Sequence, residues 1–264
     1  MRAFAFASAV SLALASLAAP AAAAPRRVAS LNLCTDELLL LLADPRQIAS
    51  VTHLSHQPAE TALWRQARAH PRNDGSLLSV AGLRPDLVLT MGGGGRDRLR
   101  IAGRLGIRTL DLPFAQSLDD VERSVALVAE ALGRPEAGRR VTARIAALRQ
   151  SAPPAGRDAI WLGGGGRTVS ATGLEAQWMV LAGLRQRALP GDRVPLETLL
   201  ARPPAVLLRS DYRAGQFSGN QRWLGHPLAR GAGKARMLAT DGRRWTCMGP
   251  PMVDEILRLR AELR

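Results

Sequence analysis

The side chains best suited to chemistry in this sequence are its two cysteines. Cys34 and Cys247 stand near opposite ends of the 264-residue chain. Thiols are ligands for soft metal ions, and an even number of cysteines in an oxidising compartment predicts a disulfide. Three hypotheses follow: a disulfide that joins the start of the chain to its end, a metal site, or two separate thiols that line a pocket.

Histidines give a weaker signal. His53 and His56 have the spacing H-x-x-H in a predicted loop, which differs from the helical i, i+4 pair of zinc proteases, and no Glu accompanies them. The sequence has no G-x-S-x-G elbow, and its four histidines form no recognisable pattern with Ser and Asp. We therefore expect a protein that is not an enzyme.

The first residues predict where the protein works. Met1 and Arg2 are followed by an uncharged apolar run over residues 3–19, and small residues then precede Ala23. These are the features of a secretory signal peptide, which we assign to residues 1–23. No cysteine follows the cleavage site, so we expect a soluble exported protein without a lipid anchor.

The charge does not indicate a nucleic-acid partner. The formal net charge is +14, but Lys234 is the single lysine among 36 basic residues, and this skew towards arginine is typical of codon bias. Aromatic residues make up 4% of the chain and are not interleaved with a basic stretch for base stacking. Export argues further against nucleic acid.

One sequence phrase occurs in both halves of the chain. Residues 83–89 (LRPDLVL) and 201–208 (ARPPAVLL) each predict the end of a helix, a turn with proline and a short apolar strand, and Pro85 and Pro204 are about 119 positions apart. Strands that alternate with helices at this spacing predict parallel sheets. The expected fold class is α/β, with two lobes of mostly parallel sheets that face each other across a cleft.

In parallel sheets, ligands bind outside the carboxyl ends of the strands. The residues expected to bind the ligand, all at predicted strand ends, are Asn32, Cys34, His53, Met91, Arg96, Arg167, Tyr212, Trp245 and Cys247. Arg96 and Arg167 each follow four glycines, in runs that lack the Lys-Ser/Thr of a Walker loop, and their guanidinium groups suit carboxylate or phosphate.

Aromatic side chains add a second type of contact. The candidates for stacking on a large flat ligand are Trp64, Trp161, Tyr212 and Trp245. Trp178 lies in an apolar run and is predicted to belong to the core.

A long helical segment is expected to connect the lobes. Ser117 has acidic residues after it and apolar residues at helical spacing, and residues 133–135 (GRP) read as a brief interruption. Together these residues predict a helical segment of about 30 residues and roughly 45 Å. The expected organisation is an N-terminal lobe at 26–116, an interlobe helix at 117–150 and a C-terminal lobe at 157–264.

Several motifs resemble those of one family. They are RRVASLN (26–32) with ELL (37–39), LRPDLV (83–88), PLE (195–197) before LAR (200–202), and the stretch 245–250 before a last helix. In order and spacing these are similar to the substrate-binding proteins of ABC importers for cobalamin and ferric siderophores, over essentially the whole mature chain. The resemblance implies two α/β lobes joined by one long rigid helix, with the ligand held between them.

The resemblance also implies partners. The protein is expected in the periplasm as a monomer without a cofactor, where it would capture a metal chelate (cobalamin, ferric siderophore or heme) and deliver it to a membrane permease and its ATPase. The alternative is an exported metal-ion-binding protein that uses Cys, His and Met ligands or, less favoured, a secreted hydrolase. Family members carry one surface Glu on each lobe that docks onto permease arginines. Glu197 matches the C-lobe position, and Leu78 stands at the N-lobe position.

Two expectations concern geometry. Glu197 is expected at the end of its lobe opposite the cleft. Cys34 and Cys247 are expected to line the cleft as separate thiols, because a disulfide needs Cα atoms within about 7 Å and that approach would narrow the cleft.

Overall fold

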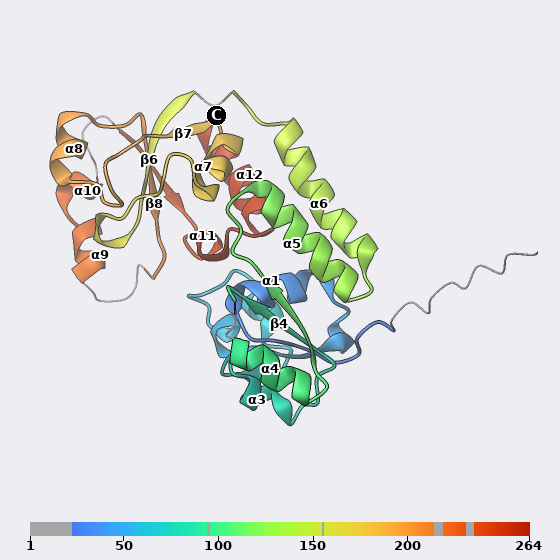
Figure 1. Ribbon diagram of the computed structural model, residues 1–264. Coiled ribbons are helices and arrows are strands. Elements are labelled where there is room, and N and C mark those ends of the chain that lie inside the picture. Colours follow the sequence, from blue (N-terminus) through green and yellow to red (C-terminus); the bar gives the residue numbers. More distant parts are fainter. Residues whose placement is uncertain (1–22, 94–95, 155, 214–218, 231–234) are drawn as a thin grey trace, which may run out of the picture.

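The computed structural model describes residues 23–93, 96–154, 156–213, 219–230 and 235–264, and within these ranges the chain forms two α/β lobes joined by a pair of helices (Figure 1). The predicted signal peptide lies outside the described residues, apart from its last residue. Among the described residues, no helix combines the length and apolar character that a membrane span requires.

The N-terminal lobe is built on a parallel sheet with the order β3-β2-β1-β4-β5. Its strands are β1 (Val28–Ser30), β2 (Ile48–Thr52), β3 (Arg72–Asn73), β4 (Leu87–Met91) and β5 (Arg108–Leu112). Its helices are α1 (Leu33–Leu42), the 3-10 turns η1 (Pro45–Gln47) and η2 (His53–His56), α2 (Trp64–Ala67), α3 (Leu77–Ala81) and α4 (Arg96–Arg104).

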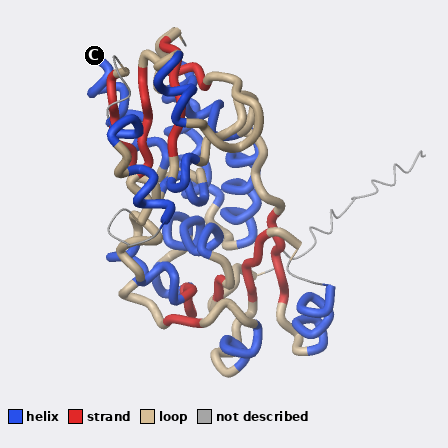
Figure 2. The backbone as a smooth tube through the Cα atoms, turned by 90° about the vertical axis from the view of Figure 1, so that its left-hand side faces the viewer, coloured by secondary structure: helices blue, strands red, loops and turns tan. Residues whose placement is uncertain are grey.

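The C-terminal lobe repeats this plan with the strand order β7-β6-β8-β9. Its strands are β6 (Arg157–Leu162), β7 (Leu184–Gln186), β8 (Val206–Ser210) and β9 (Arg236–Thr240). Its helices are the 3-10 turn η3 (Gly164–Gly166), α7 (Leu174–Leu181), α8 (Leu196–Ala201), α9 (Gly219–Leu224), α10 (Pro227–Arg230), α11 (Arg244–Cys247) and α12 (Met252–Leu263). All paired strands of both sheets run parallel, so the predicted α/β fold class is confirmed. Figure 2 shows the two groups of strands at opposite ends of the molecule, with helices between them.

The connection between the lobes differs from the single segment expected. α5 (Leu118–Ala131) and α6 (Pro135–Gln150) are two helices that pack antiparallel, so that Arg149 near the end of α6 pairs with Asp119 at the start of α5, at 2.6 Å (Figure 1). The chain reverses at Gly133, whose φ of +67° is a left-handed conformation that favours glycine.

Local sequence signals explain this reversal. The N–H of Gly133 donates to Glu130 O and that of Arg134 to Ala129 O, the paired bonds of a Schellman motif that ends a helix. Pro135 then occupies the first turn of α6, where its fixed φ suits a helix start. Residues 133–135 are therefore the end signal of α5 followed by the start signal of α6, and not an interruption within one helix.

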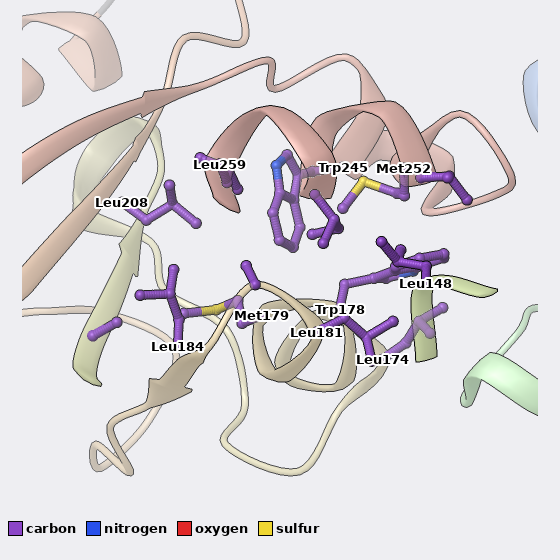
Figure 3. Close-up of a cluster of buried hydrophobic side chains, with 14 of the residues drawn as sticks. Leu148, Leu174, Trp178, Met179, Leu181, Leu184, Leu208, Trp245, Met252 and Leu259 are labelled. Carbon is purple, nitrogen blue, oxygen red and sulfur yellow. The ribbon is translucent and has the colours of Figure 1, made fainter. Parts of the chain in front are cut away.

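The two connecting helices belong to the cores of both lobes. Leu118 and Val121 of α5 pack in the C-lobe core, whereas Val125 and Val128, further along the same helix, pack in the N-lobe core. Figure 3 shows the C-lobe core, in which Trp178 is fully buried, as predicted. Because one helix contributes to two cores, the lobes are held in a fixed relation by packing as well as by chain connection.

Candidate ligand-binding site between the lobes

The cleft lies where the carboxyl ends of the two sheets face each other. In the N-lobe the strand order reverses between β1 and β4, and in the C-lobe between β6 and β8. Loops from these ends make the contacts between the lobes: Tyr212, just after β8, reaches Glu60 of the N-lobe. Such reversal points are where open parallel sheets bind ligands.

A pocket of about 610 Å³ opens at this edge of the C-lobe. Its lining residues are Trp161, Gly163, Gly164, Arg167, Thr168, Val169, Glu175, Ser210, Tyr212, Arg213, Gly242, Trp245 and Thr246. This volume is within the usual range for small-molecule sites.

Two tryptophans form an aromatic wall of the pocket. The ring centroids of Trp161 and Trp245 are 6.0 Å apart and their planes are inclined by 56°, a favourable arrangement for aromatic rings. Trp245 is 6% exposed, and its indole N–H donates to Thr240 Oγ1 at 2.7 Å, which fixes the ring. A Cβ at Gly163 would lie 2.8 Å from the Trp161 ring, so this glycine lets the indole lie against the loop. Trp161 is half-buried and Trp245 is buried, so a flat ligand in the pocket would contact mainly Trp161, which Trp245 supports.

Charged groups of the pocket are tied to the opposite lobe. Arg213 Nη2 lies 2.6 Å from Glu60 Oε1, and the Tyr212 hydroxyl donates to Glu60 Oε2 at 2.8 Å. Burial, helped by the hydrogen bond to the Glu60 carboxylate, raises the pKa of Tyr212, so its phenol stays protonated at neutral pH. A second contact between the lobes joins Arg243 Nη1 to Pro58 O at 3.0 Å.

The expectation of two separate thiols is wrong. Cys34 and Cys247 form a disulfide, with Cα atoms 5.2 Å apart. The first turn of α1 in the N-lobe and the end of α11 in the C-lobe meet at this point, which brings the two residues within the distance that a disulfide spans. The bond borders a small apolar cavity between the lobes, and the large pocket lies beside it on the C-lobe. The pocket and the bond therefore coexist.

Two buried carboxyl groups lie close to the disulfide. Burial raises the pKa of Glu37 to about 7, even though its Oε1 accepts a hydrogen bond from Thr61 at 2.6 Å. Burial also raises the pKa of its neighbour Asp36 to about 6, and Asp36 accepts hydrogen bonds from Thr52 at the end of β2 and from Ser55 in η2. Asp36 thus ties α1 to β2, while Glu37 lies at the lobe boundary.

The structure separates the predicted ligand-binding residues. It places Arg167, Tyr212 and Trp245 in the lining of the large pocket. Met91 borders the small cavity beside the disulfide. Asn32 caps α1, because its side-chain oxygen accepts from the Cys34 N–H at 2.8 Å.

Two further predicted positions, His53 and Trp64, are not among the described residues that line the pocket. His53 is exposed at the start of η2 and is not among the residues that line the pocket. Arg96 is the first residue of α4, and its side chain lies outside what is described. Trp64, a stacking candidate, instead packs against the guanidinium groups of Arg65 and Arg68, whose Cζ atoms lie 4.5 and 4.7 Å from its ring centroid.

Glu197 is exposed in the first turn of α8, but not at the end of the lobe that we expected. The Val194 N–H, just before α8, donates to Gly166 O at 2.8 Å, in the loop that follows β6. A helix that follows a parallel strand begins at the carboxyl edge of the sheet and runs back. Glu197 therefore lies towards the edge of the lobe that carries the pocket.

Sequence reasoning missed several residues of the site. Glu60 comes from an irregular loop, and Arg213 has a φ of +54° that nothing in the sequence indicates. Glu175 lies in the first turn of α7, where an acidic residue is common for helix stability and gives no signal of a ligand site. Phe114, 61% exposed beside Gly92, is a further aromatic residue in a loop at the carboxyl edge of the N-lobe. An exposed Phe next to a predicted strand end is the one signal that could have been used.

Comparisons with known proteins agree with this geometry. Residues 28–235 match the family described as periplasmic binding protein. Among solved structures, the periplasmic heme-binding protein RhuT from Roseiflexus sp. RS-1 is similar over 89% of this chain and 97% of that one, with 20% identity and a TM-score of 0.66. The periplasmic vitamin B12 binding protein BtuF of Vibrio cholerae is similar over 90% and 96%, with 18% identity and a TM-score of 0.61. The siderophore binding protein BauB is similar over 91% of this chain and 94% of that one, with 13% identity and a TM-score of 0.69. No curated protein matches the chain in sequence.

The fold and the site define a two-lobed binding protein with a pocket at the facing sheet edges. The chain belongs to the periplasmic binding protein family, because the family match covers most of its length.

Proposed function

We propose that this protein is the periplasmic substrate-binding component of an ABC importer, and that it captures a bulky metal chelate and delivers it to the membrane permease. The observation that carries the proposal is the pocket of about 610 Å³ at the carboxyl edge of the C-lobe sheet, where Glu60 of the N-lobe contacts two of its lining residues, with the aromatic wall of Trp161 and Trp245. Structural neighbours that bind heme, vitamin B12 and a ferric siderophore support the class of ligand. We expect the protein to act as a monomer.

The alternative of a bare metal-ion carrier loses its main ligands. Cys34 and Cys247 are bonded to each other, so neither thiol is free to bind a metal ion. Within the described residues, no three His, Cys, Asp or Glu side chains are grouped as a metal site. A chelate that brings its own metal needs no such ligands.

Docking onto the permease is assigned to the edge of each lobe at the carboxyl ends of its strands. Glu197 is exposed at this edge of the C-lobe. Leu78, at the matching position of the N-lobe, is 86% exposed in the first turn of α3, and Gly75 just before that helix lies against Leu31 O at the carboxyl end of β1. In the proposed docking mode, the C-lobe contributes a carboxylate and the N-lobe an apolar side chain.

A fluorescence titration tests the proposed function. The mature protein is titrated with cobalamin, heme and a panel of ferric chelates, and the intrinsic tryptophan emission is recorded, because Trp161 and Trp245 line the pocket. Quenching that saturates with one chelate supports the proposal. A response to bare divalent cations with none to any chelate would move the assignment to a metal-ion carrier.

A further inference from the structure

The charge that the pocket offers to a ligand differs from the charge of the whole chain. Among the described residues that line the pocket, Arg167 and Arg213 are cationic and Glu175 is acidic. Ion pairs within the protein already balance some of these charges, and a ligand interacts with the charge that remains. Their partners therefore decide which chelate the pocket accepts.

Arg213 is engaged on two sides. Its Nη2 lies 2.6 Å from Glu60 Oε1, and its guanidinium carbon lies 5.1 Å from the centroid of the Tyr212 ring. The Glu60 side chain is 10% exposed and that of Arg213 is 41% exposed, so water reaches this ion pair from the side of Arg213. The second Glu60 oxygen accepts from the Tyr212 hydroxyl. One N-lobe carboxylate thus occupies both polar groups that the C-lobe presents on this side of the pocket.

Arg167 is also paired, though more loosely. Its Nη2 lies 3.6 Å from Asp192 Oδ2, and the two side chains are 61% and 66% exposed. The backbones of Arg167 and Arg193 form a bridge, which keeps Asp192 close to the pocket rim. The charge of Arg167 is therefore partly balanced and largely screened by water.

Glu175 is in the opposite situation. It lies in the first turn of α7, where the helix dipole stabilises a negative charge, and it lines the pocket. Among the residues that the structure describes, no Lys, Arg or His forms an ion pair with Glu175. Its carboxylate is left to accept hydrogen bonds from a ligand.

We propose that the pocket selects a chelate that carries no net negative charge and presents hydrogen-bond donors. In this proposal Glu60 keeps Arg213 in an ion pair, and Glu175 accepts hydrogen bonds from the ligand. This inference rests on the proposed function and names the class of chelate. Amide-bearing neutral chelates and ammonium-bearing cationic chelates fit this class. Chelates with several carboxylates or catecholates do not.

The cost of the excluded alternative follows from burial. A strongly anionic ligand that used Arg213 would compete with Glu60 and leave this buried carboxylate without its cation. The pair is buried on the side of Glu60, whose side chain is 10% exposed, and open to water on the side of Arg213, which is 41% exposed, so the penalty is that of the Glu60 carboxylate alone. The same ligand would also bring negative charge towards Glu175.

Binding measurements with three chelates test the inference. The mature protein is titrated with cyanocobalamin, which is amide-bearing, with a ferric trihydroxamate that carries an ammonium group, and with a strongly anionic ferric tris-catecholate. We expect the wild-type protein to bind one of the first two at least ~10-fold more tightly than the tris-catecholate, the scale of one hydrogen bond to a charged group. This ranking needs no variant.

Two substitutions assign the preference to its residues. Glu60→Gln keeps the size of the side chain and one acceptor oxygen but removes the negative charge that pairs with Arg213. The affinity for the tris-catecholate should therefore rise about 10-fold relative to the preferred chelate. Glu175→Gln should lower the affinity for the preferred chelate by about 10-fold. The matched control is Glu136→Gln, which removes the partner of Arg139 on the exposed surface of α6 and should change neither ratio.

The outcomes separate the two proposals. Tighter wild-type binding of the tris-catecholate overturns the inference and leaves the proposed function intact. An unchanged ratio in a folded Glu60→Gln variant overturns the role of Glu60. Failure of all chelates to bind overturns the proposed function, and the inference with it.

Discussion

Cys34 and Cys247 form a disulfide with Cα atoms 5.2 Å apart, although 213 positions separate them in the chain. The bond joins the first turn of the first helix of the N-lobe to the end of the short helix α11 in the C-lobe. It lies beside the ligand pocket and borders a small cavity between the lobes. The lobes are therefore linked covalently at two places, by the chain through α5 and α6 and by this bond.

We predict that the unreduced, denatured mature protein contains no free thiol, as measured by thiol counting. Replacing both cysteines by serine should lower the free energy of unfolding by about 2–4 kcal/mol, because the bond restricts the unfolded chain. Urea denaturation of the two forms gives this difference. Two free thiols per chain in the untreated protein would contradict the disulfide.

The lobes should move little when ligand binds. α5 packs into both cores, and the disulfide joins the lobes. In addition, Arg144 Nη2 of α6 lies 2.5 Å from Asp254 Oδ1 of α12. X-ray scattering profiles with and without ligand should nearly superpose. A clear fall in the radius of gyration on binding would show that these links allow wide closure.

Stability should depend on pH through Glu37. Burial raises its pKa from 4.5 to about 7, so between these values the folded protein holds a proton that the unfolded chain has lost. This difference makes the free energy of unfolding fall as pH rises from about 4.5 to about 7. Glu37→Gln removes this contribution and keeps an oxygen for the Thr61 hydroxyl.

The difference in unfolding free energy between Glu37→Gln and wild type should therefore rise with pH over this interval, in favour of the variant, by about 1–3 kcal/mol. Denaturation of both proteins at pH 5 and pH 8 measures it. A constant difference would mean that Glu37 is ionised throughout.

Glu197→Arg should impair uptake of the chelate and leave its affinity unchanged. Glu197 is exposed at the pocket-bearing edge but is not among the residues that line the pocket. An arginine there would repel the permease arginines expected to meet it. Titration of the purified variant and growth on the chelate separate the two properties, with Glu136→Arg on α6 as the control. Equal loss of affinity and uptake would place Glu197 in the site itself.

Local patterns predicted most of the fold. The short strand predicted in each repeated phrase is present, as β4 from Leu87 and β8 from Val206, and the helix predicted after Ser117 is α5. These features depend on alternation, apolar runs and capping residues, which are local in the sequence. The reversal at Gly133 is also local, but its signals were interpreted as an interruption within one helix.

The site could be predicted only in part, because its contacts cross between the lobes. Tyr212 and Trp245 were found from their places at strand ends. Glu60 could not be found in this way, since its role depends on how one lobe is placed against the other. The same placement decides that Cys34 and Cys247 are bonded.

The central claim is that a metal chelate binds against the aromatic wall of the C-lobe, and calorimetric titration with the chelate panel tests it most directly. We predict that one chelate binds per chain, and that Trp161→Ala weakens its affinity by about 10-fold or more through loss of ring contact. Trp64→Ala, which removes a tryptophan that does not line the pocket, should leave the affinity within about 2-fold of wild type, the scale of a surface change. Failure of every chelate to bind, or unchanged binding in Trp161→Ala with a large loss in Trp64→Ala, would contradict the account.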